Sequence, residues 1–221
     1  MSKKSSIIHH SSSINRLALI VSRLFDPAWM IPGMLAVAAG WSLLNGLRWR
    51  FIVILLLIDG LMPFLYFVHL LSTKEISDWD TTKREQRIKL YGFTLVAHSI
   101  GAVLAFLLGK IVLAKILFLF LILATVFTLI TFKWKISIHT GVSSAAVVFL
   151  SLLFGLNWMW LFLIVLAVAW ARITMKKHTL AQAVLGAMVA AGIISFGFHI
   201  LGINSDSAIN SSRICILGNW C

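Results

Sequence analysis

Charged residues are scarce in this sequence, and acidic residues are the scarcest of them. Only 12% of the 221 residues are charged, whereas about a quarter of the residues in a soluble domain are charged. Seven Asp and Glu stand against 19 Lys and Arg, so the formal net charge is +12. With 60% hydrophobic residues, this composition excludes an ordinary soluble domain. In a membrane protein a basic excess faces the cytoplasm and anionic lipid, so we expect a lipid bilayer and no nucleic acid as partner.

Cysteines and metal-binding patterns are also few. Cys215 and Cys221 are the only two cysteines, and no C-x-x-C or other metal-ligand spacing occurs. We therefore predict no metal site and no cofactor. The two thiols would form a disulfide if the C-terminal tail lies outside the cytoplasm, and two free thiols are the other interpretation.

Long apolar runs make up most of the chain, and they are continuous rather than alternating, which excludes a β-barrel. Several runs reach the roughly 20 residues needed to cross a hydrocarbon core of about 30 Å. The sequence therefore predicts an all-α, polytopic transmembrane helical bundle with six to seven spans. Gly109-Lys110 and Gly155-Leu156-Asn157 interrupt apolar runs and predict tight turns. The seven apolar segments cover approximately residues 28–46, 51–72, 91–109, 111–132, 140–156, 157–171 and 180–201.

Two short segments flank the predicted transmembrane domain, which covers residues 27–203. A polar arm, residues 1–26, precedes it. We expect the Ser-rich start of this arm, residues 1–13, to be disordered and residues 14–25 to form an interfacial amphipathic helix. A short tail, residues 204–221, follows the last span.

The distribution of basic residues predicts the orientation. Seven spans place fourteen of the 19 Lys and Arg on the side of the N-terminus, and the other side holds Arg48, Arg50, Lys110, Lys115 and Arg213. The positive-inside rule then predicts a multi-pass protein of the cell membrane with its N-terminal side in the cytoplasm. Three polar clusters fall on that side, at residues 73–90, 133–140 and 171–182, with two helices between each and the next. We expect the clusters to converge there into one site.

Two histidines in these clusters are the candidates for chemistry. His139 and His178 each begin an apolar helix, and lysines lie beside both. The 73–90 loop holds four of the seven acids together with several cations. An Arg side chain can donate two hydrogen bonds to one phosphate, so the loop offers candidate phosphate-binding residues. A solvated loop with local ion pairs is the alternative. The candidate cations of the loop are Lys83, Arg84 and Arg87.

Three further histidines lie inside the apolar runs. Intramembrane polar groups invite functional interpretations, but His69, His98 and His199 have no evident partner in the sequence. We therefore interpret all three as structural.

Two short motifs carry a family resemblance. Arg172, five residues, His178, three residues and then Gln182 resemble the third signature of the type 2 phosphatidic acid phosphatases, S-R-x5-H-x3-D. The segment Ser137-Ile138-His139 resembles the second signature of that family, P-S-G-H. Each motif adjoins an apolar helix, and the two occur in the family's order.

The first signature is matched less closely. Asp80, six residues and then Arg87-Ile88 resemble K-x6-R-P, and the three motifs together cover approximately residues 74–201. Several positions depart from the family's pattern. Gln182 replaces its Asp, and a Gln carbonyl can accept a hydrogen bond but supplies no charge. The other departures are Asp80 for Lys, Ile88 for Pro, Ile138 for Gly and Ala171 for Ser.

The resemblance implies a metal-independent lipid phosphatase that acts through a phosphohistidine. His178 would attack phosphorus, and His139 would protonate the leaving alkoxide. Gln182 would hold the nucleophile. The substrate would be a phosphate or diphosphate of an isoprenoid or glycerolipid in the membrane. The phosphate oxygens would be bound by Arg172, Ser137, Arg87, Lys83, Arg84 and Lys135.

Three other functions stay open. A catalytically impaired relative would keep the fold without hydrolysis. An intramembrane prenyltransferase would need two Asp-rich magnesium motifs, and only Asp78 and Asp80 offer one. A transporter or scaffold would place polar residues at mid-span, between broken helices. The polar residues here cluster at one membrane edge instead, which favours chemistry on a lipid headgroup. The oligomeric state is not predicted.

Overall fold

The computed structural model describes residues 2–43 and 45–203, and every regular element in this part of the chain is helical. A 3₁₀ helix that ends at Gln86 leads directly into a long α-helix that begins at Arg87. A π-helix interrupts one of the earlier membrane-spanning stretches. The elements are α1 (Ser2–Leu24), α2 (Pro27–Ser42), α3 (Asn45–Leu55), the π-helix η1 (Leu56–Leu61), α4 (Met62–Ser72), the 3₁₀ helix η2 (Arg84–Gln86), α5 (Arg87–Leu107), α6 (Ile111–Lys133), α7 (Ile138–Phe154), the 3₁₀ helix η3 (Leu156–Leu161), α8 (Phe162–Thr174) and α9 (Leu180–Leu201).

The predicted all-α membrane bundle is confirmed. Six helical stretches of the described chain are long and apolar enough to cross a membrane, and α7, with 17 residues, is a shorter apolar helix. Four of the six combine elements separated above, namely the end of α1 with α2 across the break at Asp26, α3 with η1 and α4, η2 with α5, and η3 with α8. The six stretches are Ser13–Ser42, Arg48–Ser72, Arg84–Leu107, Ile111–Lys133, Leu156–Thr174 and Leu180–Leu201.

The turns between helices lie where glycine predicts them. Gly109 and Gly155 have φ values of 69° and 107°, in the region that L side chains rarely adopt. Gly155 ends α7, and η3 then leads into α8, so the predicted hairpin is confirmed. The start of the chain differs from expectation, because α1 is helical from Ser2 and includes most of the segment expected to be disordered. The predicted tail, with Cys215 and Cys221, lies outside the described residues.

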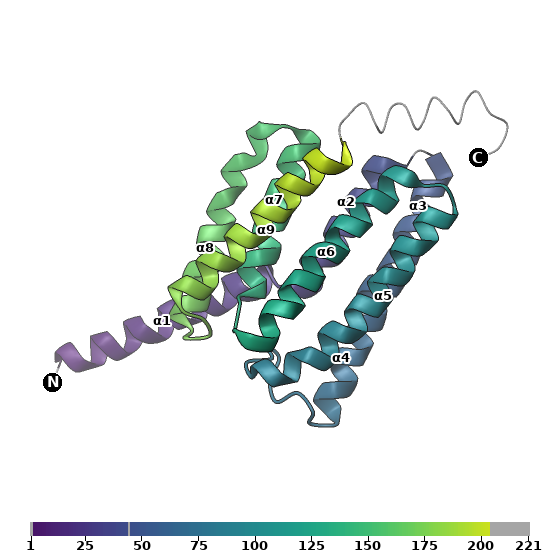
Figure 1. Ribbon diagram of the computed structural model, residues 1–221. Helices are drawn as coiled ribbons and strands as arrows, with labels where there is room; N and C mark the ends of the chain where they lie inside the picture. Colours follow the sequence, from purple (N-terminus) through teal and green to yellow (C-terminus); the bar gives the residue numbers. More distant parts are fainter. Residues whose placement is uncertain (1, 44, 204–221) are drawn as a thin grey trace.

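The helices form two adjoining groups. Figure 1 shows α7, α8 and α9 on the left and α5 with α6 on the right, while α1 projects sideways from the lower end of the bundle. Helix α2 packs against both α6 and α7, and α6 also packs against α9, so the groups share one apolar core. Among its largest fully buried side chains are Leu35, Leu113 and Phe149.

Small residues let α7 and α9 approach closely. A Cβ on Gly186 would lie 2.6 Å from the carbonyl oxygen of Ser137, so no larger residue fits there. Two side-chain hydrogen bonds cross the same interface, from Thr140 Oγ1 to the Ala183 carbonyl (3.0 Å) and from Ser144 Oγ to the Ala187 carbonyl (2.9 Å). Small residues and hydroxyl hydrogen bonds are typical of helix contacts in membranes. This contact fixes the start of α7 beside the start of α9.

His98 has a partner, which corrects the interpretation that it has none. Its Nδ1 lies 2.8 Å from Oδ1 of Asp59, and both side chains are buried. Its Nε2 lies 2.9 Å from the Leu117 carbonyl oxygen, which can only accept, so Nε2 carries a proton. One further proton is therefore shared between Nδ1 and the Asp59 carboxyl. Sequence spacing gave no sign of this pair because 39 residues separate its members.

We predict that His98→Leu destabilises the protein by about 3 kcal/mol, because it leaves the buried Asp59 carboxyl without its partner. The double variant Asp59→Leu, His98→Leu should recover part of this loss. His69→Leu is the matched control, since His69 is exposed on α4. Unfolding in detergent, followed by circular dichroism against denaturant, measures the change. Equal stability of His98→Leu and His69→Leu would refute the prediction.

Candidate functional site

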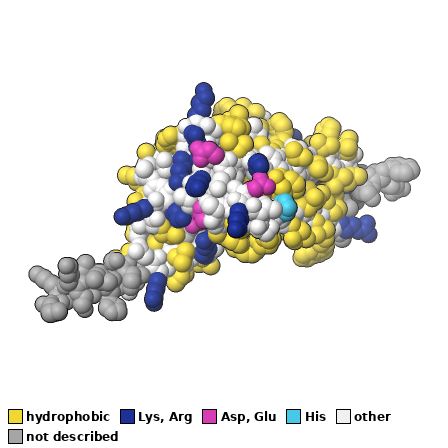
Figure 2. Space-filling model, turned by 90° about the horizontal axis from the view of Figure 1, so that it is seen from below, with side chains coloured by type: hydrophobic (Ala, Val, Ile, Leu, Met, Phe, Trp, Pro, Cys, Tyr) yellow, Lys and Arg dark blue, Asp and Glu magenta, His cyan; other side chains and the backbone are white. Residues whose placement is uncertain are grey.

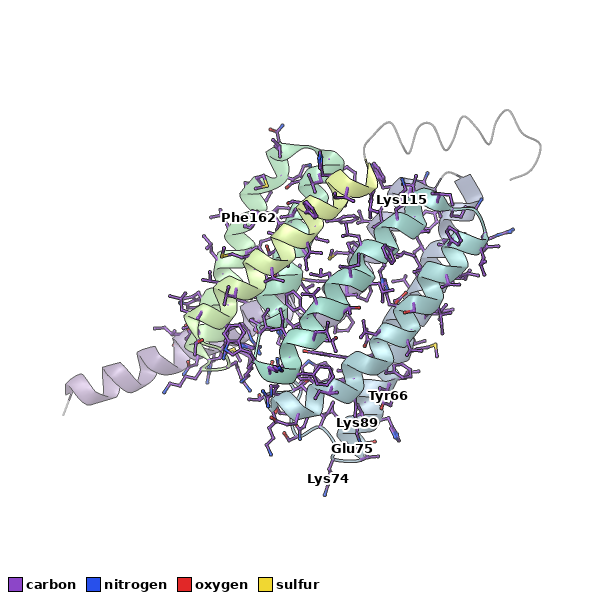
Figure 3. The ribbon with its side chains drawn as sticks, viewed as in Figure 1. Tyr66, Lys74, Glu75, Lys89, Lys115 and Phe162 are labelled. Atoms are coloured by element: carbon purple, nitrogen blue, oxygen red, sulfur yellow. The ribbon has the colours of Figure 1, made fainter. Side chains whose placement is uncertain are left out.

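The three polar clusters converge at the lower end of the bundle, as predicted. Seen from below, this end gathers Lys, Arg, Asp and Glu within an otherwise apolar surface (Figure 2). Figure 3 places Lys74, Glu75 and Lys89 at this end, whereas Lys115 and Phe162 lie at the other. Hydrogen bonds join the clusters directly. Among them are those from Arg84 Nη1 to the Lys133 carbonyl (2.8 Å), from Arg172 Nη1 to Asp80 Oδ1 (2.8 Å) and from the Ser137 amide to the Gln182 carbonyl (3.2 Å).

The turn after α8 sets the distance between Arg172 and His178. The carbonyl oxygen of Arg172 accepts hydrogen bonds from the amides of Lys177 (3.0 Å) and His178 (3.3 Å). Lys176, with φ of 54°, reverses the chain between them. The five-residue spacing of the third motif is therefore one closed turn that returns His178 to the end of the helix carrying Arg172.

A capping box at the start of α9 orients His178. Thr179 is the N-cap, and its side chain accepts from the Gln182 amide, while Gln182 Oε1 accepts from the Thr179 amide at 3.2 Å. A backbone amide only donates, so this contact identifies the oxygen of the Gln182 side chain. The same Oε1 lies 3.1 Å from His178 Nδ1, which must therefore donate. His178 Nε2 is left with the lone pair. The prediction that a Gln carbonyl can accept this hydrogen bond is confirmed.

The Nη1 atom of Arg172 is bound by other side chains of the protein. Its side chain is 1% exposed, and its Nη1 donates to Ser22 Oγ (2.9 Å) and Asp80 Oδ1 (2.8 Å) and lies 3.5 Å from His139 Nε2. Its Nε finds no partner among the described residues. Asp80 also approaches Lys177 Nζ at 3.3 Å. Asp80, which stands where the first signature has Lys, thus binds Arg172, the arginine predicted to bind phosphate.

A second carboxylate lies beside His139. Asp26 is the N-cap of α2, accepting from the Ala28 amide at 3.0 Å, and its Oδ2 lies 3.7 Å from His139 Nε2. Arg23 of α1 pairs with Asp26 at 3.3 Å. Sequence reasoning did not identify Asp26, Arg23 or Ser22 as part of the site. The signal available for Asp26 was its place before Pro27 at the start of an apolar run, which is a helix N-cap pattern.

A cavity of about 210 Å³ opens between these groups. Arg87, His139 and His178 line it, together with Asp26 and Asp80. Arg87 is 3% exposed and is held by the carbonyls of Thr81 (2.8 Å) and Ile136 (3.3 Å), so its position at the wall is fixed.

The remaining predicted phosphate-binding residues lie away from this wall. Ser137 is fully buried and caps α7 through the Thr140 amide. Arg84 donates to the Lys133 carbonyl and pairs with Glu85, and Lys83 is exposed. Lys135 is not among the wall residues but is near enough to the site to act on the charge of His178.

Burial and the surrounding cations keep His178 neutral. Burial, together with the charges of Arg87, Arg172 and Lys135, lowers the pKa of His178 from 6.5 to about 3. Burial and the charge of Arg87 likewise lower the pKa of Lys135. For Asp80, burial alone would raise the pKa, but the hydrogen bond and charge of Arg172 with two further cations lower it to about 2. At neutral pH the site therefore holds an unprotonated imidazole and an ionised Asp80.

The chemistry available is that of a neutral imidazole beside fixed cations. Among the described residues, no three His, Cys, Asp or Glu side chains are grouped so that they could hold a metal ion. No family model, curated protein or solved structure matches this chain. The resemblance to the type 2 phosphatidic acid phosphatases therefore rests on the three short motifs.

We predict that Arg87→Gln raises the pKa of His178 towards 6.5, because it removes a neighbouring cation that disfavours the imidazolium. The rise should be incomplete, since burial persists. An NMR titration of the His178 ring measures it. Lys89→Gln is the control, because Lys89 pairs with Glu75 on the surface and should leave the titration unchanged. A pKa unchanged by Arg87→Gln would contradict the arrangement of charges described above.

Proposed function

We propose that this protein is an integral-membrane phosphatase that hydrolyses the phosphate of an isoprenoid or glycerolipid through a phosphohistidine. The observation that carries the proposal is the state of His178, which is neutral, donates Nδ1–H to Gln182, and lines a cavity that it shares with Arg87. A histidine nucleophile needs a free Nε2 lone pair. Fixed cations beside it stabilise the charge that builds on the phosphoryl oxygens.

The proposed reaction has two steps. Nε2 of His178 attacks phosphorus as the P–O bond to the lipid breaks, and the departing alkoxide takes a proton from His139. Water then attacks phosphorus as the P–N bond to His178 breaks and His139 accepts its proton, which releases inorganic phosphate and restores the Nε2 lone pair. The Asp26 carboxylate would stabilise the protonated imidazole that the first step requires, against the burial and the Arg172 charge that oppose it. In this protein the carboxylate of Asp26 would act on the general acid, His139. In the family pattern, a carboxylate instead lies behind the nucleophilic histidine.

Asp80 opposes phosphate binding in the described arrangement. Its carboxylate takes the Nη1 hydrogen bond of Arg172 and approaches Lys177, and these are cations that a phosphate would use. The proposal therefore requires substrate phosphate to compete with Asp80. A prenyltransferase is less favoured, because Asp80 is bound to Arg172 and Asp78 to Thr82 and Lys177, which leaves neither free for magnesium.

We predict phosphate release from isoprenoid and glycerolipid phosphates by purified protein with chelator present. His178→Ala should abolish the release, and His139→Ala should reduce it by roughly a hundredfold or more. A folded His69→Ala variant is the control and should keep full activity. Undiminished activity in both site variants would overturn the assigned roles, and strict magnesium dependence would favour the prenyltransferase.

We predict that Asp80→Asn tightens inhibition by orthovanadate or inorganic phosphate roughly tenfold, equivalent to about 1.4 kcal/mol. The amide releases Arg172 and removes one negative charge from the site. Asp78→Asn is the matched control, because Asp78 lies on the same loop and pairs with Lys177 at 3.8 Å without contacting Arg172. Unchanged inhibition in Asp80→Asn would show that this carboxylate does not compete with phosphate.

A further inference from the structure

A second cavity adjoins the first in the membrane-spanning part of the bundle. Its volume is about 150 Å³, and it lies between α2, α5, α6 and α7. The two cavities share part of their walls. The residues that line both are Ile31, Asp59, Tyr91, Thr94 and Ile138. The space beside His139 and His178 therefore borders a cavity in the interior of the helical bundle.

The wall of this inner cavity is apolar in effect, although several of its residues are polar. Thr94 Oγ1 donates to the Leu90 carbonyl (2.9 Å), and Thr128 Oγ1 donates to the Ala124 carbonyl (2.7 Å). Asp59 Oδ1 and His98 bind each other, whereas Asp59 Oδ2 has no hydrogen-bond partner among the described residues. Aliphatic and aromatic side chains cover most of the rest of the wall. Apart from Asp59, which also lines the outer cavity, the wall therefore suits an apolar chain.

The inner cavity reaches a limited depth. Along α5 the axial rise from Arg87, at the phosphate end, to His98 is about 16 Å at 1.5 Å per residue. Along α6, Ala124 lies about 14 Å from Lys133, and Phe120 lies about 20 Å from it. His98, Ala124 and Phe120 therefore mark the inner end, near the middle of a hydrocarbon core of about 30 Å.

We infer that the inner cavity receives one apolar chain of the phosphate ester and limits its length, with Ala124 as a specificity-determining residue. The inference rests on the proposed function and adds a substrate class to it, namely a lipid phosphate with a chain of about 16 Å between its phosphate and the inner end of the cavity. It is supported by adjacency, because the cavity lined by His139 and His178 shares wall residues with the apolar cavity.

The test compares linear alkyl phosphates from hexyl to octadecyl in hydrolysis, and the matching non-hydrolysable alkylphosphonates in thermal stabilisation of the detergent-solubilised protein. In the wild type, kcat/KM and the thermal shift should rise with chain length until the chain spans the cavity, and then stop rising. Ala124→Leu should lower both for long chains, kcat/KM by roughly tenfold, and leave the hexyl compound unchanged, because extra methyl groups shorten the space.

Thr125→Leu is the matched control, since Thr125 is the next residue on α6 and lines neither cavity. It should behave as wild type across the whole series. A response that rises steadily to octadecyl, identical in Ala124→Leu, would overturn the inference. Failure of the proposed function would look different, because all phosphates would then resist hydrolysis while the phosphonate series still reported whether Ala124 limits the chain.

Discussion

A guanidinium that is 1% exposed must find its acceptors inside the protein, and Arg172 takes them from separate parts of the chain. Ser22 of α1 and Asp80 of the loop before η2 both accept from it, and His139 of α7 lies beside it. Its backbone carbonyl holds the turn that returns His178. Removing this side chain would therefore leave Asp80 buried without its main cation and would remove the contacts that Arg172 makes with α1 and with the loop.

The two histidines of the site differ in their charged neighbours. Burial and the charges of Arg87, Arg172 and Lys135 lower the pKa of His178. His139 lies between a cation and a carboxylate, because its Nε2 is 3.5 Å from Arg172 Nη1 and 3.7 Å from Asp26 Oδ2. The carboxylate beside His139 is what distinguishes its surroundings from those of His178.

Composition and pattern predicted the helical membrane bundle, the turns at Gly109 and Gly155 and the convergence of three polar clusters, because each follows from local apolarity or from the alternation of spans. The contact of Gln182 Oε1 with His178 Nδ1 was also predictable, since both belong to one helix start. Pairs that form across the bundle, between residues far apart in the sequence, were not predictable. Asp59 with His98, and Asp80 with Arg172, depend on how helices rotate and how a loop folds back, which no spacing encodes.

The π-helix η1 divides its span into two parts with different neighbours. One wide turn adds a residue to the helical register, so the faces before and after it are out of phase by about 100°. Phe51 and Leu55 before it belong to the main core, whereas Phe67 and Leu70 after it form a separate small core with Ile76. The segment that leads to Asp80 therefore packs on a small apolar core of its own, and hydrogen bonds of Arg84, Arg87 and Arg172 tie it to the rest of the bundle.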